Sequence, residues 1–345
     1  MVALLASGFA ARGLETVLAL QVEAKENAGF IDPAVRIELL GAEHAKATWR
    51  LARLIRRERP DISLSALGFC NLKHALAATL AGRRNRAILS FHGHIDVEPG
   101  SASRVANRLS PVTTRLTARS VCVSDWMRRH VVADLHGDAR RAVTIHNPAP
   151  VDHAAPAVDE AKLLARQAIV LALGRLVPDK GFATLIDAFA RLDHPDAKLI
   201  ILGEGPERAA LEQRVLSLGL AGRVEMPGYV TQPWAYFARA RACAVSSVSE
   251  SFSNAAVEAL AHGLPVVSTD CGGPAEIILR PELGRLVPVG DVAALSEALA
   301  AVLRSPGDPA PRLARAQVFS LHRVLDAYER LFEQVIAEAT ASQSR

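Results

Sequence analysis

Two glutamates, Glu250 and Glu258, are separated by seven residues and follow a short apolar run, Ala242–Val245. Small hydroxyl residues lead from that run into a helical pattern that Ser253 or Asn254 can cap. The pattern places the first glutamate on the loop before a helix and the second about one turn inside it. Helix N-termini bind phosphate, and acceptor-only carboxylates suit the hydroxyls of a sugar or a ribose. The alternative is that both are ordinary solvent-facing side chains.

A pair of cations follows another apolar run, Ala168–Leu173. Arg175 and Lys180 would stand at the carboxyl end of the strand that this run predicts. An arginine fork and a lysine point charge together can clamp a diphosphate and neutralise charge that grows on a leaving group. Basic residues after a strand are common at protein surfaces, so this pair alone indicates little.

Glycines follow the next apolar run, Lys198–Leu202, in the order Gly203, Glu204, Gly205. Glycine at the end of a strand permits a tight turn and a close approach of backbone to a ligand. The alternative is a plain turn between a strand and the helix after it.

The first half of the chain offers two further candidates. Val2–Ala6 is interpreted as a first strand, so Gly13 would belong to the loop after it. Ala87–Phe91 is interpreted as another strand, and His92 and His94 follow it directly. Two histidines this close would also fit a metal site, but no third ligand is evident, and no Asp-x-Asp pair follows a strand in either half. We therefore expect no bound metal.

Both halves alternate short apolar runs with longer helical patterns, such as 13–24, which is typical of parallel βαβ units. The proline-rich segment Asn147–Pro156 is interpreted as a linker. Two Rossmann-like domains, 1–150 and 157–318, would then face a central cleft, where the carboxyl ends of parallel strands bind ligands. The expected strands are 2–6, 62–64, 87–91 and 120–124 in the first half and 168–173, 198–202, 223–226, 242–245 and 265–269 in the second.

The charge is divided unevenly between the two halves. Residues 1–150 hold 21 Lys and Arg against 13 Asp and Glu, a net charge of +8, and the rest holds 19 against 23, a net of −4. The basic half would suit an anionic membrane surface or an anionic substrate; a solvated arginine-rich surface is the alternative. Aromatic residues are not interleaved with the basic ones, so nucleic acid is not an expected partner. The scattered cysteines and the lack of a long apolar run predict a cytoplasmic protein, with the inner face of the membrane as a possible location.

The segment that begins at Glu250 resembles the retaining glycosyltransferases of the GT-B type, known as group 1 or family 4. Their hallmark is a glutamate, seven residues and a second glutamate. The matching positions are Glu250, Phe252, Asn254, Glu258, Ala259, Ala261, Gly263, Pro265, Val266 and Val267. The resemblance implies that Glu250 contacts the sugar of the donor and Glu258 holds the ribose hydroxyls. It also implies that backbone amides around Phe252, Ser253 and Asn254 reach the sugar and the distal phosphate.

Other family elements are matched less fully. Arg175 and Lys180 fit the element G-R-x-x-x-x-K-G, which implies that they bind the diphosphate. The resemblance places the loop 203–205 and the turn that contains Tyr229 near the base and the diphosphate. Gly13 matches part of the family's glycine-rich loop, which admits donor phosphates and the acceptor, and His92 matches a histidine that faces the sugar.

The resemblance implies an α/β protein of the GT-B fold, with a C-terminal helix, about 319–340, that crosses back to the first domain. It implies transfer of a hexose, with retention, from a nucleotide-diphosphate sugar to a glycan or a lipid-linked acceptor. A UDP-sugar is the favoured donor, and neither a metal nor another cofactor is expected. The alternatives are a nucleotide-sugar epimerase of the same fold and a catalytically silent sugar-binding subunit.

Overall fold

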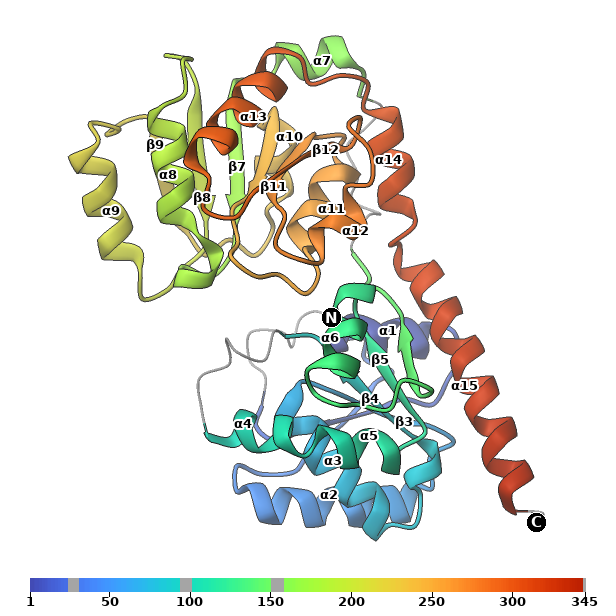
Figure 1. The fold of residues 1–345 in the computed structure, drawn as a ribbon. Coiled ribbons are helices and arrows are strands. Elements are labelled where there is room, and N and C mark those ends of the chain that lie inside the picture. Colours follow the sequence, from blue (N-terminus) through green and yellow to red (C-terminus); the bar gives the residue numbers. More distant parts are fainter. Residues whose placement is uncertain (24–30, 94–100, 150–157, 344–345) are drawn as a thin grey trace. The chain divides into compact units, whose positions relative to one another are not determined.

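The computed structural model describes residues 1–23, 31–93, 101–149 and 158–343 (Figure 1). The chain forms two compact units, Met1–Pro148 with Leu321–Arg345, and Ala149–Ser320. Every strand pairing within the sheets is parallel. Each unit therefore has the α/β architecture that the alternating pattern predicts.

The second unit contains a six-stranded sheet in the order β12-β11-β10-β7-β8-β9. The order changes direction next to β7, so the loops after β7 and β10 leave the sheet at a topological switch point, where open parallel sheets bind ligands. Its strands are β7 (Ile169–Leu173), β8 (Lys198–Leu202), β9 (Val224–Gly228), β10 (Ala242–Val245), β11 (Val266–Thr269) and β12 (Gly284–Val287). Its helices are α7 (Glu160–Ala165), α8 (Phe182–Ala190), α9 (Arg208–Ser217), α10 (Trp234–Arg239), α11 (Asn254–Ala261), α12 (Pro274–Ile277), α13 (Val292–Arg304) and α14 (Ala310–Gln317).

The central strands β7, β8, β10 and β11 are mostly apolar and buried almost throughout, whereas the edge strands β9 and β12 have exposed residues. Val170 and Ile201 pack on Leu185 and Phe189 of α8 and on Leu299 of α13 in one apolar core. Strands buried on both faces are typical of parallel sheets covered by helices on each side.

The first unit has a four-stranded sheet in the order β3-β4-β5-β6 and a separate pair, β1 with β2. Alternate residues of the central strands face opposite layers: Ile88 and Val121 pack with α1 and α15, and Leu89 and Cys122 with α3 and α6. The strands are β1 (Val17–Leu20), β2 (Arg36–Leu39), β3 (Ser63–Ala66), β4 (Ala87–Phe91), β5 (Arg119–Cys122) and β6 (Ala142–Thr144). The helices are α1 (Val2–Ala11), α2 (His44–Glu58), α3 (Gly68–Leu80), α4 (Ser101–Arg108), α5 (Ser110–Leu116), α6 (Asp125–Ala133) and α15 (Leu321–Gln343).

The C-terminal helix α15 packs against α1, so the last residues of the chain belong to the first unit. A Cβ atom on Gly8 would lie 2.7 Å from Leu325, which explains the small residue at this contact. The guanidinium of Arg12 adds ion pairs of 2.8 Å to Asp326 and 2.9 Å to Glu329.

The interpretation of the first residues of the chain as a strand is wrong, because Val2–Ala11 forms helix α1. Leu5 and Phe9, one turn apart, are buried, which is a helical spacing that a short apolar run does not reveal. The expected helix over 13–24 is wrong as well, because Val17–Leu20 is strand β1. The predicted linker falls mostly on residues 150–157, outside the described ranges. Within those ranges, no helix is both long and apolar enough to cross a membrane.

Candidate active site

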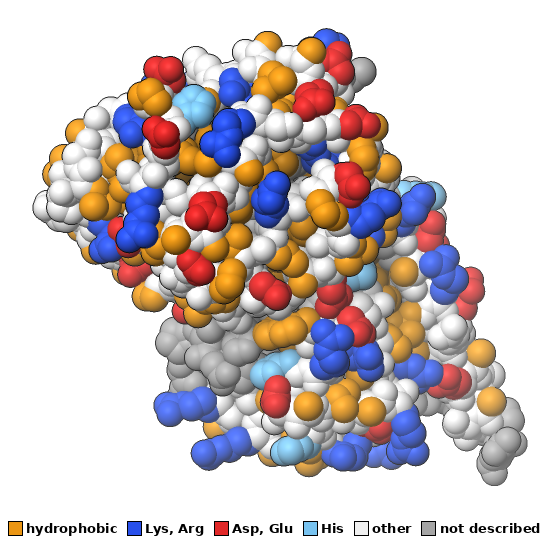
Figure 2. All heavy atoms as spheres, turned by 45° about the horizontal axis from the view of Figure 1, so that its top comes forward, with side chains coloured by type: hydrophobic (Ala, Val, Ile, Leu, Met, Phe, Trp, Pro, Cys, Tyr) orange, Lys and Arg blue, Asp and Glu red, His pale blue; other side chains and the backbone are white. Residues whose placement is uncertain are grey.

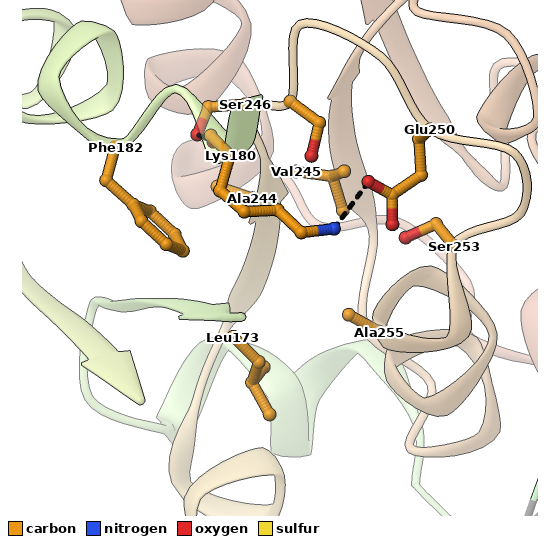
Figure 3. A pocket seen from close by; sticks show the side chains of 10 residues that line it. Leu173, Lys180, Phe182, Ala244, Val245, Ser246, Glu250, Ser253 and Ala255 are labelled. Carbon is orange, nitrogen blue, oxygen red and sulfur yellow. Dashed lines mark hydrogen bonds and ion pairs between the residues drawn. The ribbon is translucent and has the colours of Figure 1, made fainter. Parts of the chain in front are cut away.

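The loops after β7 and β10 enclose a small pocket at the carboxyl edge of the second unit's sheet (Figure 3). Lys180 reaches from the first loop toward Glu250 on the second, and Ser253 stands beside that glutamate. The lining residues are Leu173, Lys180, Phe182, Ala244, Val245, Ser246, Ser247, Glu250, Ser253 and Ala255.

The Lys180 ammonium and the Glu250 carboxylate form the central contact of the pocket, with 2.6 Å between Nζ and Oε2. The loops that carry them are joined through the backbone. Ser246 Oγ donates a hydrogen bond of 2.8 Å to the Lys180 carbonyl, and Val248 N–H donates one of 2.7 Å to the Asp179 carbonyl. The two opposite charges are therefore held by a fixed frame and not only by their own attraction.

Gly181 makes this close approach of the two loops possible. Its φ is +60°, and a Cβ atom there would lie 2.1 Å from the Ser246 carbonyl oxygen. Any side chain would therefore push the Lys180 loop away from the loop that carries Glu250.

The backbone of Glu250 is fixed on its other side by the segment after β11. Glu250 N–H donates to the Cys271 carbonyl at 3.1 Å, and Gly273 N–H donates to the Glu250 carbonyl at 2.7 Å. A Cβ atom on Gly273 would lie 2.3 Å from the Ser251 carbonyl oxygen. The glycine after β11 thus allows the glutamate loop to be held on both sides.

Helix α11 begins beside the pocket. Ser253 Oγ accepts a hydrogen bond of 3.3 Å from Ala256 N–H, so of the two residues that the sequence offers as the cap, Ser253 is the one used. Asn254, the first residue of the helix, is exposed. The Phe252 ring is buried and stacks edge-on against Phe319, with 5.4 Å between centroids. The side chain of Phe252 therefore braces the loop, and only its backbone is left for a ligand.

Glu258 lies one helical turn inside α11, and burial raises its pKa to about 7. Within the described ranges, no side chain donates a hydrogen bond to its carboxylate or forms an ion pair with it. A partly buried carboxylate without a partner is costly to ionise, so hydroxyl donors from a ligand would stabilise its charged form.

The loop after β8 packs tightly on the loop after β7. Gly203 has a φ of +147°, and a Cβ atom there would lie 1.8 Å from the Gly174 carbonyl oxygen. A Cβ atom on Gly205 would lie 2.3 Å from the Leu176 carbonyl oxygen. The carboxylate of Glu204 is held by two hydrogen bonds from Arg208, of 2.8 and 2.6 Å. These glycines bring the backbone of the two loops together.

Arg175 and Tyr229 stand at the same edge of the sheet, after β7 and β9, and both are exposed. No carboxylate in the described part of the chain forms an ion pair with Arg175. Its guanidinium is therefore available to an anionic ligand, unlike the Lys180 ammonium, which Glu250 already pairs.

In the first unit, His92 follows β4, as the sequence predicts. Its Nε2 lies 2.8 Å from Ser90 Oγ, and burial lowers its pKa to about 4. The imidazole is therefore neutral near pH 7, so one ring nitrogen can donate a hydrogen bond and the other can accept one. His94 lies outside the described residues.

The expected position of Gly13 is wrong. It lies between α1 and β1, before the first strand and not after it. Its φ is +84° and no atom lies within 4 Å of the place its Cβ would take. Gly13 therefore ends a helix, and the structure does not place it in a loop at the carboxyl end of a strand, where a ligand would bind.

The sequence reasoning missed several lining residues. Ser246 and Ser247 follow β10 directly, and a pair of small hydroxyl residues at the end of a buried strand was a signal that could have identified them. Leu173, Phe182 and Ala255 gave no such signal, because apolar residues at strand and helix ends are ordinary core residues. Across the residues that the structure describes, no group of three or more His, Cys, Asp or Glu side chains could hold a metal ion.

Similarity to known proteins covers both units. The family model for group 1 glycosyl transferases matches residues 158–317, and the model for glycosyltransferase family 4 matches residues 1–153. The lipopolysaccharide core biosynthesis glycosyltransferase LpsE of Rhizobium meliloti is 36% identical over 183 residues, 51% of this chain and 53% of LpsE. A phosphatidyl-myo-inositol mannosyltransferase of Mycobacterium leprae is 36% identical over 191 residues, 54% of this chain and 50% of the relative. The chain thus spans about half the length of these relatives.

Solved structures match almost the whole chain. The crystal structure of Anabaena HepE in complex with UDP and glucose superimposes with a TM-score of 0.83 and 18% identity, over 96% of this chain and 95% of HepE. Sucrose-phosphate synthase from Thermosynechococcus elongatus superimposes with a TM-score of 0.77 and 20% identity, over 97% and 92% of the two chains. With a GT-B fold throughout and a family model for each unit, the chain belongs to the group 1 glycosyltransferases.

Proposed function

We propose that this protein moves a hexose, with retention of configuration and without a metal, from a nucleotide-diphosphate sugar to a glycan or a lipid-linked acceptor. The observation that carries the proposal is the pocket in which Lys180 and Glu250 meet at 2.6 Å beside the start of α11. A cation, an acceptor-only carboxylate and a helix N-terminus together suit a sugar joined to a diphosphate.

The charged residues of the site bind different parts of the donor. Arg175 and Lys180 bind the diphosphate and stabilise the negative charge that develops as the sugar leaves. Glu250 accepts hydrogen bonds from the sugar hydroxyls, and Glu258 accepts those of the ribose. Since the cations compensate the leaving group, the protein has no need of a metal for this role.

Transfer occurs on the face of the sugar that the diphosphate leaves. The acceptor hydroxyl forms a hydrogen bond to the departing phosphate oxygen, which takes its proton as the new glycosidic bond forms. His92, neutral near pH 7, contacts the sugar and takes no charge itself. Glu250 orients the donor in this scheme and forms no covalent bond.

The known proteins support the choice of substrates. HepE is crystallised with UDP and glucose, which supports a UDP-hexose as the donor. LpsE is named for lipopolysaccharide core synthesis, and the Mycobacterium leprae relative for mannosyl transfer to phosphatidyl-myo-inositol. These names favour an acceptor that is a glycan or is linked to a lipid.

The test combines nucleotide binding with sugar release. Lys180→Ala is expected to weaken binding of a nucleoside diphosphate by about tenfold or more, since a charge-assisted contact contributes about 1.5–3 kcal/mol. Glu250→Gln is expected to preserve or strengthen that binding, because it frees the ammonium from its ion pair, while sugar transfer falls by at least about tenfold. Calorimetric titration with UDP and a chromatographic assay of several nucleotide-sugars measure the two effects.

Matched controls come from a surface ion pair in the same unit, Lys198 with Glu225, 3.3 Å apart. Lys198→Ala and Glu225→Gln should leave both binding and transfer unchanged. Near-normal transfer in both site variants would overturn the assignment. Conversion of the donor to its epimer without release of the nucleotide would identify an epimerase, and binding without turnover would identify a silent subunit.

A further inference from the structure

Helices α4 and α5 of the first unit bury small and polar residues and expose apolar ones. Val105 is 48% exposed and Val112 is 53% exposed, with Leu109 between them at helical spacing. The buried side of the same helices is formed by Ala106, Ser110, Thr113, Thr114 and Thr117. A helix that faces water normally has the opposite distribution.

The buried hydroxyls of these helices are satisfied by the helix backbone. Thr114 Oγ1 donates to the Ser110 carbonyl at 2.7 Å, and Thr117 Oγ1 donates to the Thr113 carbonyl at 2.9 Å. They therefore pack inward with their hydrogen bonds made. This explains how the polar side is buried, but folding alone gives no reason for the apolar side to face outward.

Helix α3 also exposes apolar residues, although its buried side is largely apolar as well, with Leu72, Ala75, Ala77 and Ala78. Leu76 is 49% exposed and Leu80 is 60% exposed, one turn apart, whereas Asn71 and His74 are buried and hydrogen-bonded. In Figure 1, α3 lies between α2 and the α4–α5 pair, and it contacts each of these helices. The exposed leucines of α3 therefore belong to a helix that has α2 on one side and α4 with α5 on the other.

Helix α2 adds an aromatic side chain and two arginines to this surface. Trp49, 61% exposed, shares one helical face with Arg53 and Arg56. The Arg53 guanidinium lies 5.9 Å from the centre of the indole ring, and Arg56 donates a hydrogen bond of 2.6 Å to the carbonyl of Leu80 on α3. The tryptophan face of α2 thus continues into the apolar stripe of α3.

Acidic residues are few in the sequence of this region, where only Glu58, Asp61, Asp96 and Glu98 occur between residues 44 and 124. Residues 44–57, 62–95 and 99–124 contain no Asp or Glu. The two glutamates that bracket the core of α2 are paired, Glu43 with Lys46 at 2.9 Å and Glu58 with Arg36 at 2.6 Å. In Figure 2, blue Lys and Arg side chains dominate the lower border of the view, over the first unit. Apolar and positively charged side chains therefore share one surface.

We propose that this surface, the α2–α5 face, docks the protein on an anionic lipid bilayer. The face is defined by its apolar residues Trp49, Leu76, Leu80, Val105, Leu109 and Val112 and by its arginines Arg53, Arg56, Arg104 and Arg108. Apolar side chains enter the acyl boundary, tryptophan lies at the headgroup level, and arginines attract anionic headgroups. A surface with one sign of charge suits a lipid headgroup layer better than a protein partner, whose surface mixes both signs.

Docking deepens the proposed function, because a lipid-linked acceptor would be held at the surface on which the enzyme rests. It does not depend on that function, since membrane binding requires no donor and no transfer. The two ideas are therefore separable by experiment.

The test is co-sedimentation of the full chain with vesicles of phosphatidylcholine mixed with phosphatidylglycerol, and of phosphatidylcholine alone. The protein is expected to bind the mixed vesicles, and high salt is expected to weaken binding. Each arginine removed should lower the partition coefficient about fivefold, so Arg104→Ser with Arg108→Ser lowers it about 25-fold. Val105→Ser with Val112→Ser should lower it as well, without loss of fold, because both side chains are exposed.

The control is Arg191→Ser with Arg304→Ser, which removes two exposed arginines from the second unit. This variant is expected to bind within about twofold of the unchanged protein, since its arginines lie outside the face. Equal losses in the control and the face variants, or failure of the protein to bind mixed vesicles, would overturn the proposal. Binding only to native membranes, and not to pure lipid, would mean that the face recognises a membrane protein instead. Release of sugar from the donor in solution, measured on the same variants, should be unchanged.

Discussion

Glu258 is a carboxyl group in surroundings that penalise its charge. Burial raises its pKa from the ordinary value of 4.5 to about 7. By contrast, Glu250 has the Lys180 ammonium at 2.6 Å as its partner. The two glutamates of the sequence motif therefore differ chemically before a ligand binds, because Glu250 is in an ion pair and Glu258 has no hydrogen-bond donor among the described side chains.

The raised pKa of Glu258 predicts how stability depends on pH. The folded state holds its proton more tightly than the unfolded state, so the contribution of this group is fully present below about pH 4.5 and is lost as pH rises to about 7. The loss is on the order of 3 kcal/mol, at about 1.4 kcal/mol for each pKa unit. The loss is measured by denaturant unfolding of the protein and of Glu258→Gln at several pH values in this range. It appears as a change with pH in the difference between their free energies of unfolding.

The difference in free energy of unfolding between the unchanged protein and Glu258→Gln should change only between about pH 4.5 and pH 7, since the glutamine does not titrate. A constant difference from pH 4.5 to pH 7 would contradict the raised pKa. Nucleotide affinity gives a second measurement, in which affinity rises over the pH range where the stability contribution of Glu258 falls. Because ribose hydroxyls donate to the ionised carboxylate, binding of UDP should strengthen as pH rises toward about 7 and then become constant.

At the scale of the elements, the site depends on loops that touch through their backbones. Gly181 against Ser246, Gly203 against Gly174 and Gly273 against Ser251 are all contacts that a Cβ atom would prevent. These contacts join the loops after β7, β8, β10 and β11, so the positions of Lys180 and Glu250 follow from the sheet itself.

Two glycine substitutions distinguish the stability cost of a steric clash between the loops from the cost of a left-handed backbone alone. Gly181 and Gly219 have similar φ values, +60° and +67°, but only the first has an atom, the Ser246 carbonyl oxygen, in the way of a Cβ. Gly219→Ala should cost about 1 kcal/mol for its left-handed backbone. Gly181→Ala should cost about 1–3 kcal/mol more, because the loops must move apart. Thermal unfolding of the two variants measures the difference, and equal costs would show that the loops yield freely.

The elements also show where sequence reasoning succeeds. The expected strands over 198–202 and 242–245 coincide with β8 and β10, because their buried residues, 199–202 and 242–245, are all apolar. The prediction of a strand over residues 2–6 failed for a related reason. Helix α1 lies against both the sheet and α15, so its residues are apolar on most sides and show no clear period. Gly13 was misplaced as a result.

The ion pair of the site lies beyond what sequence can predict. Lys180 and Glu250 are 70 positions apart, and only the parallel pairing of β7 with β10 brings their loops to one edge. The motif predicts which residues are used, and the sheet order determines which of them meet. The partnership of Phe252 with Phe319 is of the same kind, since no local pattern links them.

At the scale of the whole molecule, each unit has a core of its own. Tyr328 of α15 is 2% exposed and packs with Phe9 in the first unit, and Phe189 of α8 is fully buried in the second. The C-terminal helix therefore completes a core made by residues far from it in sequence. Loss of an aromatic side chain from either core should destabilise mainly the unit that contains it.

This separation is tested with one substitution in each core. Tyr328→Ala and Phe189→Ala should each cost about 3–5 kcal/mol, through lost burial and the cavity left behind. Ligand binding adds about 2.7 kcal/mol to the folded state that binds it, at a concentration of about 100 times Kd. In calorimetry, Phe189→Ala should lower the unfolding temperature of the second unit, and UDP should raise the unfolding temperature of that same transition. Tyr328→Ala should lower the unfolding temperature of the first unit, which UDP should leave unchanged. If either substitution lowers both transitions equally, the two cores unfold as one, and α15 joins them into a single cooperative unit.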